Sequence, residues 1–185
     1  WERTFDQMNR LARFSPDGTT VIAGPDGNSD IVLLDARSGD NVWAFDPEER
    51  LDWLRNARWS PDGSRFVTSH ADGRLAVFSD DFDLLWEVDI GEFAMLLEVD
   101  ADHNVYAAGK NRELFGFDGE GNLRFRRRIP NHVVTAGSNN MDASGNQIAL
   151  GTVGGVLQMY DTDGTMRWQR RFEGDLQGHN ALDMT

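Results

Sequence analysis

The fold is decided by Gly164-Thr-Met-Arg-Trp168-Gln-Arg-Arg-Phe172, because its tryptophan is the last of a regular series. Each earlier member also closes a unit in which an apolar strand ends in Asp or Ser and a turn rich in Gly and Asp precedes the aromatic strand. The members are Trp1, Trp43, Trp86, Phe125 and Trp168, at successive intervals of 42, 43, 39 and 43 residues. A period of about 40 to 45 residues with several short strands per unit is typical of the blades of a β-propeller.

We therefore expect an all-β chain that forms a β-propeller of four-stranded antiparallel blades. Residues 1–185 are expected to be a single propeller region with four complete blades. The expected segments are 1–5 (last strand of a preceding blade), 10–46, 55–90, 94–129 and 133–172 (the four blades) and 180–185 (first strand of a following blade). These ends suggest four blades of a larger propeller of about seven or eight, and the alternative is a compact four-bladed ring with two spare strands.

The periodic aromatic residues are predicted to be structural. Strands such as Ile31-Val-Leu-Leu34 are apolar throughout, which indicates burial on both faces. A four-stranded sheet cannot bury both faces alone, so neighbouring blades must cover them. A tryptophan placed between two sheets buries roughly 150–250 Å², enough to contribute several kcal/mol at each junction.

Two motifs relate the chain to known propeller families. Asp35-Ala-Arg-Ser-Gly-Asp-Asn-Val-Trp43 resembles the blade signature of the PQQ-like (quinoprotein-dehydrogenase-like) propellers, in which Asp, Ala and Gly precede a docking Trp. The turns Phe14-Ser-Pro-Asp-Gly18 and Trp59-Ser-Pro-Asp-Gly63 are similar to those of WD-repeat propellers, although the Trp-Asp dipeptide is missing at the ends of the third strands. The resemblance covers nearly the whole chain and implies an architecture, not one activity.

The composition is strongly acidic. The net charge is −13, Lys110 is the only lysine among 18 basic residues, and there is no cysteine. The charge argues against nucleic acid or anionic lipid as the partner, and the lack of cysteine excludes disulfides and thiolate metal sites. Excess carboxylates with almost no lysine resemble the proteins of extreme halophiles, and the alternative is an acidic protein from a GC-rich genome.

No run of about 18 apolar residues suggests a membrane span. We expect a cytoplasmic location, while an extracytoplasmic one stays open because any signal peptide would lie upstream of Trp1.

The sequence predicts no catalytic, cofactor-binding or metal-binding set. There is no G-x-S-x-G motif, and His70, His103, His132 and His179 lack the spacing of metal ligands. Asp-rich turns such as Asp100-Ala-Asp-His-Asn104 have oxygens for calcium, but they lack the carboxylate that an EF-type loop needs and are expected to be plain turns. The resemblance implies quinone and calcium binding in some family members, but no matching acid–amide set is present.

One polar position recurs in the first strand of each blade. Aligning these strands on their turns makes five residues equivalent: Arg13, Arg58, Glu98, Asn140 and Asp183. First strands line the central channel of a propeller, so these residues are candidates for a polar ring that binds a small molecule or ion. The alternative is a set of Arg–carboxylate pairs that satisfy one another between blades.

A second candidate surface is basic. Arginines crowd two outer strands, and those assigned to partner binding are Arg126, Arg127, Arg128, Arg170 and Arg171. They suit the carboxylates or phosphates of a partner, or alternatively discourage pairing at the sheet edges. Trp53, in the connector after the first blade, is either an interface anchor or a cover over that blade.

Together these features predict a non-enzymatic propeller that serves as a scaffold or binding module for a protein partner or larger assembly. The alternative is a fragment of a quinone-dependent oxidoreductase, or a carbohydrate-active propeller, with a site at the central axis.

Overall fold

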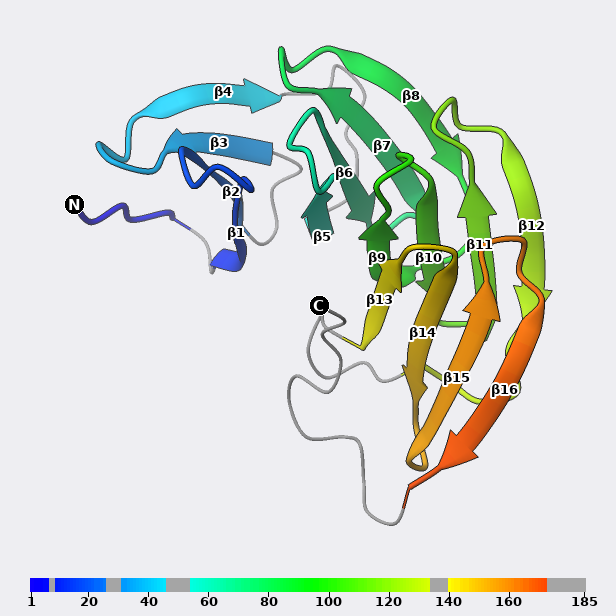
Figure 1. Ribbon diagram of the computed structural model, residues 1–185. Coiled ribbons are helices and arrows are strands. Elements are labelled where there is room, and N and C mark those ends of the chain that lie inside the picture. The colour runs from blue at the N-terminus through cyan, green and yellow to red at the C-terminus, as the bar shows by residue number, and fades with distance from the viewer. Residues whose placement is uncertain (7–8, 26–30, 46–53, 134–139, 173–185) are drawn as a thin grey trace. The chain divides into compact units, whose positions relative to one another are not determined.

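The computed structural model describes residues 1–6, 9–25, 31–45, 54–133 and 140–172. In these residues sixteen strands form four separate four-stranded sheets (Figure 1). Every sheet is an antiparallel meander in which each strand pairs with the strand that precedes it in the chain. The described residues contain no helix, and so none long and apolar enough to cross a membrane. The predicted all-β class with four-stranded antiparallel blades is confirmed.

The strands fall into four consecutive groups. The first sheet contains β1 (Asn9–Phe14), β2 (Thr20–Pro25), β3 (Ile31–Asp35) and β4 (Asn41–Phe45). The second contains β5 (Leu54–Trp59), β6 (Arg65–His70), β7 (Arg74–Ser79) and β8 (Leu84–Asp89). The third contains β9 (Ala94–Val99), β10 (Val105–Gly109), β11 (Glu113–Phe117) and β12 (Leu123–Arg128). The fourth contains β13 (Met141–Ser144), β14 (Gln147–Thr152), β15 (Val156–Asp161) and β16 (Met166–Arg171).

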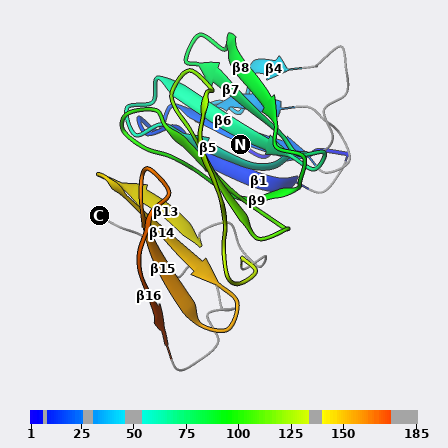
Figure 2. The same cartoon turned by 90° about the vertical axis from the view of Figure 1, so that its right-hand side faces the viewer.

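The chain divides into two compact units, Trp1–Glu92 and Phe93–Thr185, and each holds two sheets. Figure 2 shows the same elements after a quarter turn. Residues 1–5, expected to be a last strand, have no strand assignment in the structure. The expected first strand at 180–185 lies outside the described residues.

Within each unit, the first strands are the closest elements of the two sheets. In the first unit β1 lies against β5, and in the second unit β9 lies against β13. The last strand of each sheet, such as β8 or β16, is largely exposed. Each unit is therefore a pair of blades with their first strands together and their last strands outward, the order expected for a propeller.

The core of the first unit is made by both of its sheets. Ile22 and Leu33 of the first sheet pack in one cluster with Phe66 and Phe78 of the second. On the opposite face of the first sheet, Val32 and Leu34 form a smaller cluster that is covered by Phe5. The apolar strand β3 is thus buried on both faces, as its sequence predicts.

The second unit has an equivalent core. Leu96, Tyr106 and Leu114 of the third sheet pack with Ile148 and Leu150 of the fourth. The two tyrosines of the chain are both in this cluster. The Tyr106 hydroxyl donates a hydrogen bond to Asp100 at 2.8 Å. For Tyr160, burial raises the pKa of the hydroxyl to about 12.

A β-bulge recurs in the last hairpin of every sheet. The register between the third and fourth strands shifts by one residue, so that Val42, Leu85, Arg124 and Arg167 are left without a direct partner. In each case the next residue is the periodic aromatic one. A bulge bends its strand and redirects the following side chain, which here turns the aromatic ring to one face of its sheet.

In the first unit Trp1 and Trp43 each lie on the turn between the third and fourth strands of the sheet that follows them in the chain. Trp43 of β4 stacks on Phe82, in the β7–β8 turn of the second sheet, at 5.5 Å between ring centroids, and meets Phe66 and Phe78 edge-on. Trp1 lies on Gly39, in the β3–β4 turn, and its indole nitrogen donates to the Ala36 carbonyl at 3.0 Å. Phe82 and Gly39 both have positive φ, at 70° and 77°.

The same contact occurs in the second unit. Phe125 of β12, only 4% exposed, lies between Gly116 of its own sheet and Gly164 in the β15–β16 turn of the next sheet. Gly164 has a φ of 81°, and a Cβ there would meet the Phe125 ring at 2.5 Å. Trp168, the corresponding residue of the last described sheet, is 44% exposed. Trp43 and Phe125 thus each pack against a left-handed turn residue of the following sheet. A docking role for the whole series of periodic aromatic residues stays a prediction.

We expect Gly164→Ala to lower the free energy of unfolding of the second unit by about 2–4 kcal/mol. About 1 kcal/mol arises from the left-handed backbone and the remainder from displacing Phe125. Gly145→Ala is the matched control, because Gly145 also has positive φ but open space around its Cβ, and it should cost only about 1 kcal/mol. Denaturant titrations monitored by circular dichroism measure both. Equal losses would contradict the docking contact.

Candidate functional site

The strand register assigns the candidate axial positions. Arg13, Arg58 and Glu98 each pair with a residue of the second strand in their sheets, namely Ile22, Val67 and Tyr106. In the fourth sheet the equivalent pair is Asp142 with Ala149. The predicted residue, Asn140, precedes β13 and is buried, and its carbonyl accepts a hydrogen bond from Gly151. Asp183 lies outside the described residues.

The sequence alignment predicted Asn140 instead of Asp142 because the β13–β14 turn is shorter than the other turns. Ser144 pairs directly with Gln147, whereas Ser15 and Ser60 are each followed by the four-residue loop that contains Pro-Asp-Gly. Alignment on turn residues alone therefore shifted the fourth sheet by two positions.

The four register-matched residues are half-buried and differ in charge between the units. Arg13 and Arg58 belong to the first unit, and Glu98 and Asp142 to the second. Arg58 donates to the Asn56 side chain at 2.9 Å and to the Ala57 carbonyl at 3.0 Å. None of the four is without an interaction partner. Whether they form one ring across the two units stays a prediction.

The arginines of the predicted basic surface are exposed on β12 and β16. Several are held by neighbours: Arg126 makes a bidentate ion pair with Glu113 and lies over the Phe115 ring, and Arg170 lies over Phe172. The pKa of Asp163 is lowered mainly by a hydrogen bond from the backbone N–H of Thr165, and the positive charge of Arg127 contributes to a smaller extent.

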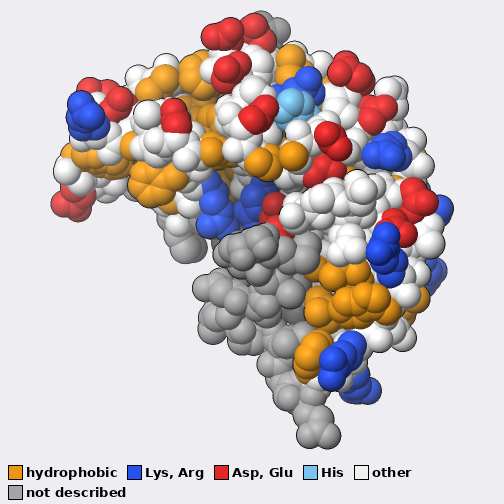
Figure 3. All heavy atoms as spheres, in the orientation of Figure 1, with side chains coloured by type: hydrophobic (Ala, Val, Ile, Leu, Met, Phe, Trp, Pro, Cys, Tyr) orange, Lys and Arg blue, Asp and Glu red, His pale blue; other side chains and the backbone are white. Residues whose placement is uncertain are grey.

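Two further arginines of the same strands, which were not assigned to partner binding, also have partners: Arg167 pairs with Asp161, and Arg124 donates to Asn104. Among the described residues Arg127, Arg128 and Arg171 have no carboxylate in an ion pair with them. Figure 3 shows basic side chains (blue) along the outer edge of the second unit, over β12 and the end of β16. Trp53, the other predicted partner contact, lies outside the described residues.

Two hydrogen-bonded turns on the first unit repeat one another. Ser15 donates to Asp17 at 2.5 Å, and Thr19 donates to the same carboxylate through its backbone N–H and its hydroxyl. These bonds, led by that from Ser15, lower the pKa of Asp17. Ser60, Asp62 and Ser64 make the same set of bonds in the second sheet.

A cleft of about 310 Å³ lies between these two turns and the β7–β8 turn. Its lining residues include the aspartates Asp17, Asp62 and Asp80 and the aromatic residues Trp59 and Phe82. Both Ser-Pro-Asp-Gly turns are evident in the sequence. The cleft is not, since the sequence does not reveal how two turns 45 residues apart face each other.

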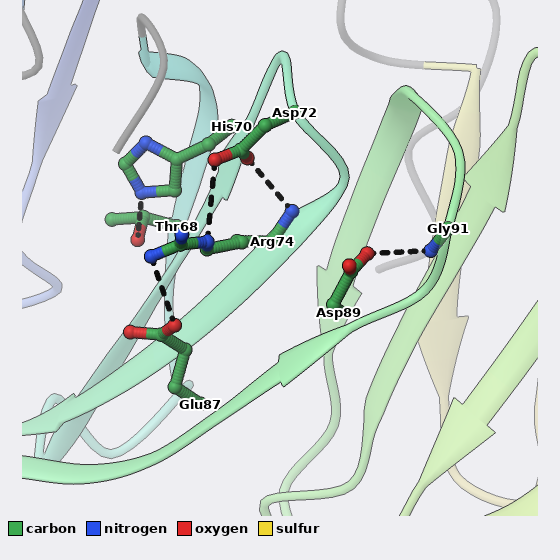
Figure 4. Close-up of polar contacts among 7 residues, drawn as sticks. All are labelled: Thr68, His70, Asp72, Arg74, Glu87, Asp89 and Gly91. Atoms are coloured by element: carbon green, nitrogen blue, oxygen red, sulfur yellow. Dashed lines mark hydrogen bonds and ion pairs between the residues drawn. The ribbon is translucent and has the colours of Figure 1, made fainter. Parts of the chain in front are cut away.

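His70 and Arg74 of the second sheet are held by neighbouring polar groups. His70 is fully buried and its Nε2 lies 3.0 Å from the Thr68 hydroxyl (Figure 4). On the surface beside it, Arg74 lies between Asp72 and Glu87, at 3.3 and 3.5 Å (Figure 4). The described part of the chain contains no group of three or more His, Cys, Asp or Glu side chains placed to hold a metal ion.

The Asp-rich turns considered for calcium are closed by their own hydrogen bonds. Asp100 accepts from the backbone of Asp102 and Asn104 through one oxygen, and from Asn104 and Tyr106 side chains through the other. Hydrogen bonds from Asn122 similarly lower the pKa of Asp118. Both turns have the geometry of plain Asx turns.

A family model described as outer membrane protein assembly factor BamB matches residues 27–183. The chain belongs to this family. The match covers β3 and β4 of the first sheet and all of the other three sheets. The predicted PQQ-like and WD-repeat-like resemblance is confirmed.

Two solved structures show the same fold for this family member. "Structure of U3-55K" matches with a TM-score of 0.78 and 11% identity, covering 94% of this chain and 55% of that one. "Crystal structure of RRP9 WD40 repeats" matches with a TM-score of 0.79 and 11% identity, covering 94% and 54%. The chain thus spans about half the length of these propellers. No curated protein matches the chain in sequence.

Proposed function

We propose that the chain is a non-enzymatic propeller module that binds a protein partner through the basic band, defined as Arg126, Arg127 and Arg128 of β12 with Arg170 and Arg171 of β16. The main support is the clustering of basic residues on two strands of the second unit. The second unit contains nine basic residues, and seven of them lie on these two outer strands. On a chain with net charge −13, such a cluster is a specific feature of one surface.

The rigid setting of the band supports this role. Both strands are held in complete sheets, and Phe125 fixes β12 from the buried side. Arginine suits carboxylate recognition because its planar guanidinium makes paired hydrogen bonds. The family description, an outer membrane protein assembly factor, favours a protein partner that works within a larger assembly. The band therefore fits an acidic protein surface.

The alternative predicted from the resemblance is a quinone-dependent oxidoreductase or a carbohydrate-active propeller with an axial site. The family is compatible with it, but no contact among the described residues favours it specifically.

We expect a fluorescently labelled, glutamate-rich peptide to bind the intact chain and to lose at least about ten-fold in affinity in the double variant Arg127→Glu with Arg170→Glu. The charge reversal replaces attraction by repulsion at the band. Fluorescence anisotropy at low salt measures the affinity, and added salt should weaken it.

The matched control is Arg3→Glu with Arg37→Glu, which changes the net charge equally but on the first unit. It should leave most of the affinity. An equal loss in both double variants would show that only overall charge matters and would overturn the basic band as a site.

We also propose that the acidic surface adapts the chain to concentrated salt, as the halophile-like composition suggests. Acidic side chains (red) are dispersed over the visible face of the first unit (Figure 3). In dilute buffer these negative charges repel one another and destabilise the folded chain.

Raising KCl from about 0.1 M to about 2 M should therefore increase the thermal midpoint by several degrees, because salt screens this repulsion. A variant with fewer exposed carboxylates should show a smaller increase; suitable exposed positions, changed to Asn or Gln, are Glu2, Asp6, Asp40, Asp81 and Glu120. Scanning calorimetry measures both proteins. An equal rise in thermal midpoint for both proteins would contradict the proposal.

A further inference from the structure

We propose that the cleft between the two Ser-Pro-Asp-Gly turns of the first unit binds an arginine side chain of the partner. The proposal rests on the proposed function only in taking the partner to be a protein. It adds a second contact of opposite polarity to the basic band, formed by different residues on the other unit.

The cleft is suited to a cation by its charge. Three aspartates, Asp17, Asp62 and Asp80, line it, and the described lining residues include no lysine or arginine. Hydrogen bonds from Ser15 and Thr19 lower the pKa of Asp17, which further favours its ionised form. The whole first unit is acidic, with 19 Asp and Glu against nine Arg. A positive side chain is therefore attracted from a distance and finds its counter-charges in place.

The aromatic walls favour an organic cation. Trp59 lies against Phe66 at 5.1 Å between ring centroids, and Phe82 is stacked on Trp43, so packing holds both rings before any ligand arrives. A guanidinium group stacks on aromatic faces while it donates to carboxylates. The volume of about 310 Å³ admits a side chain and not a folded element.

Trp59 supplies a second and independent observation. Its indole nitrogen is shielded from solvent but donates no hydrogen bond to any described residue. A buried donor without an acceptor is destabilising by about 1–3 kcal/mol, and such groups in a native protein need an explanation. The proposal includes a rotation of the Trp59 ring on binding, which brings this donor to a carbonyl oxygen of the bound peptide segment.

A bare metal ion fits the cleft less well. The carboxylates of Asp17 and Asp62 already accept several hydrogen bonds from their own turns, which occupy oxygens that a metal would need. Among the described residues, those of the cleft included, no three His, Cys, Asp or Glu side chains are placed to hold a metal ion together. An arginine can donate to the remaining lone pairs without dismantling either turn.

The probe is N-acetyl-arginine amide, compared with N-acetyl-citrulline amide, which has the same shape but no charge. The indole N–H signal of Trp59 in the ¹⁵N NMR spectrum of the intact chain, assigned with Trp59→Phe, reports binding. The arginine compound should shift this signal in a saturable manner, and the citrulline compound should bind at least about five-fold more weakly.

Two variants test the carboxylates. Asp80→Asn should weaken arginine binding about three- to five-fold. Among the described residues Asp80 joins its turn through its backbone N–H, which donates to the Ser64 carbonyl, and not through its side chain, so the fold should survive. Asp62→Asn should act in the same direction. Asp118→Asn is the matched control, because Asp118 makes the same kind of turn bonds in the second unit, and it should leave binding unchanged.

Equal binding of the arginine and citrulline compounds, or an unchanged affinity in Asp80→Asn, would overturn the proposal. Neither result affects the glutamate-rich peptide and the basic band, which involve only residues of the second unit. Failure of the cleft and failure of the proposed function are therefore distinguishable.

Discussion

The architecture depends on one contact, the packing of an aromatic ring from the last strand of one sheet against a left-handed turn residue of the next. Trp43 on Phe82 and Phe125 on Gly164 are two chemically different forms of it. A four-stranded sheet with two apolar faces is not stable in isolation, so its stability comes from such junctions. The β-bulge that precedes each ring aims it, and the left-handed turn leaves room for it or meets it with another ring.

Much of this could be predicted from sequence because the repeat is periodic and the determinants are local. The spacing of Trp43, Trp86 and Trp168, the apolar run Ile31–Leu34 and the Ser-Pro-Asp-Gly turns each follow from short-range rules. The bulges could not be predicted, since the residue types of Val42 and Arg167 do not indicate a position without a cross-strand partner. Phe82 was equally hidden: a left-handed turn position normally favours glycine, and only the stacking of Trp43 explains a phenylalanine there.

The surface was harder to predict than the core. The arginines of β12 and β16 were visible as a cluster, but their individual partners, such as Glu113 for Arg126, depend on cross-strand register. One error arose in the same way, because the short β13–β14 turn makes Asp142, not Asn140, the counterpart of Glu98. The acidic cleft arises where two distant turns meet. Charge on this chain is therefore organised by the docked sheets: an acidic cleft on one unit, and a basic band on the other.

The most direct measurement of the docking contact is a double-mutant cycle on the first unit, with Trp43→Leu, Phe82→Gly and the double variant compared with the parent chain by denaturant unfolding. If the stacked rings join the two sheets, the losses in unfolding free energy should be non-additive, with a coupling of about 1 kcal/mol or more. Additivity within about 0.3 kcal/mol would mean that the two rings do not support each other, and the account of how these sheets are held together would be wrong.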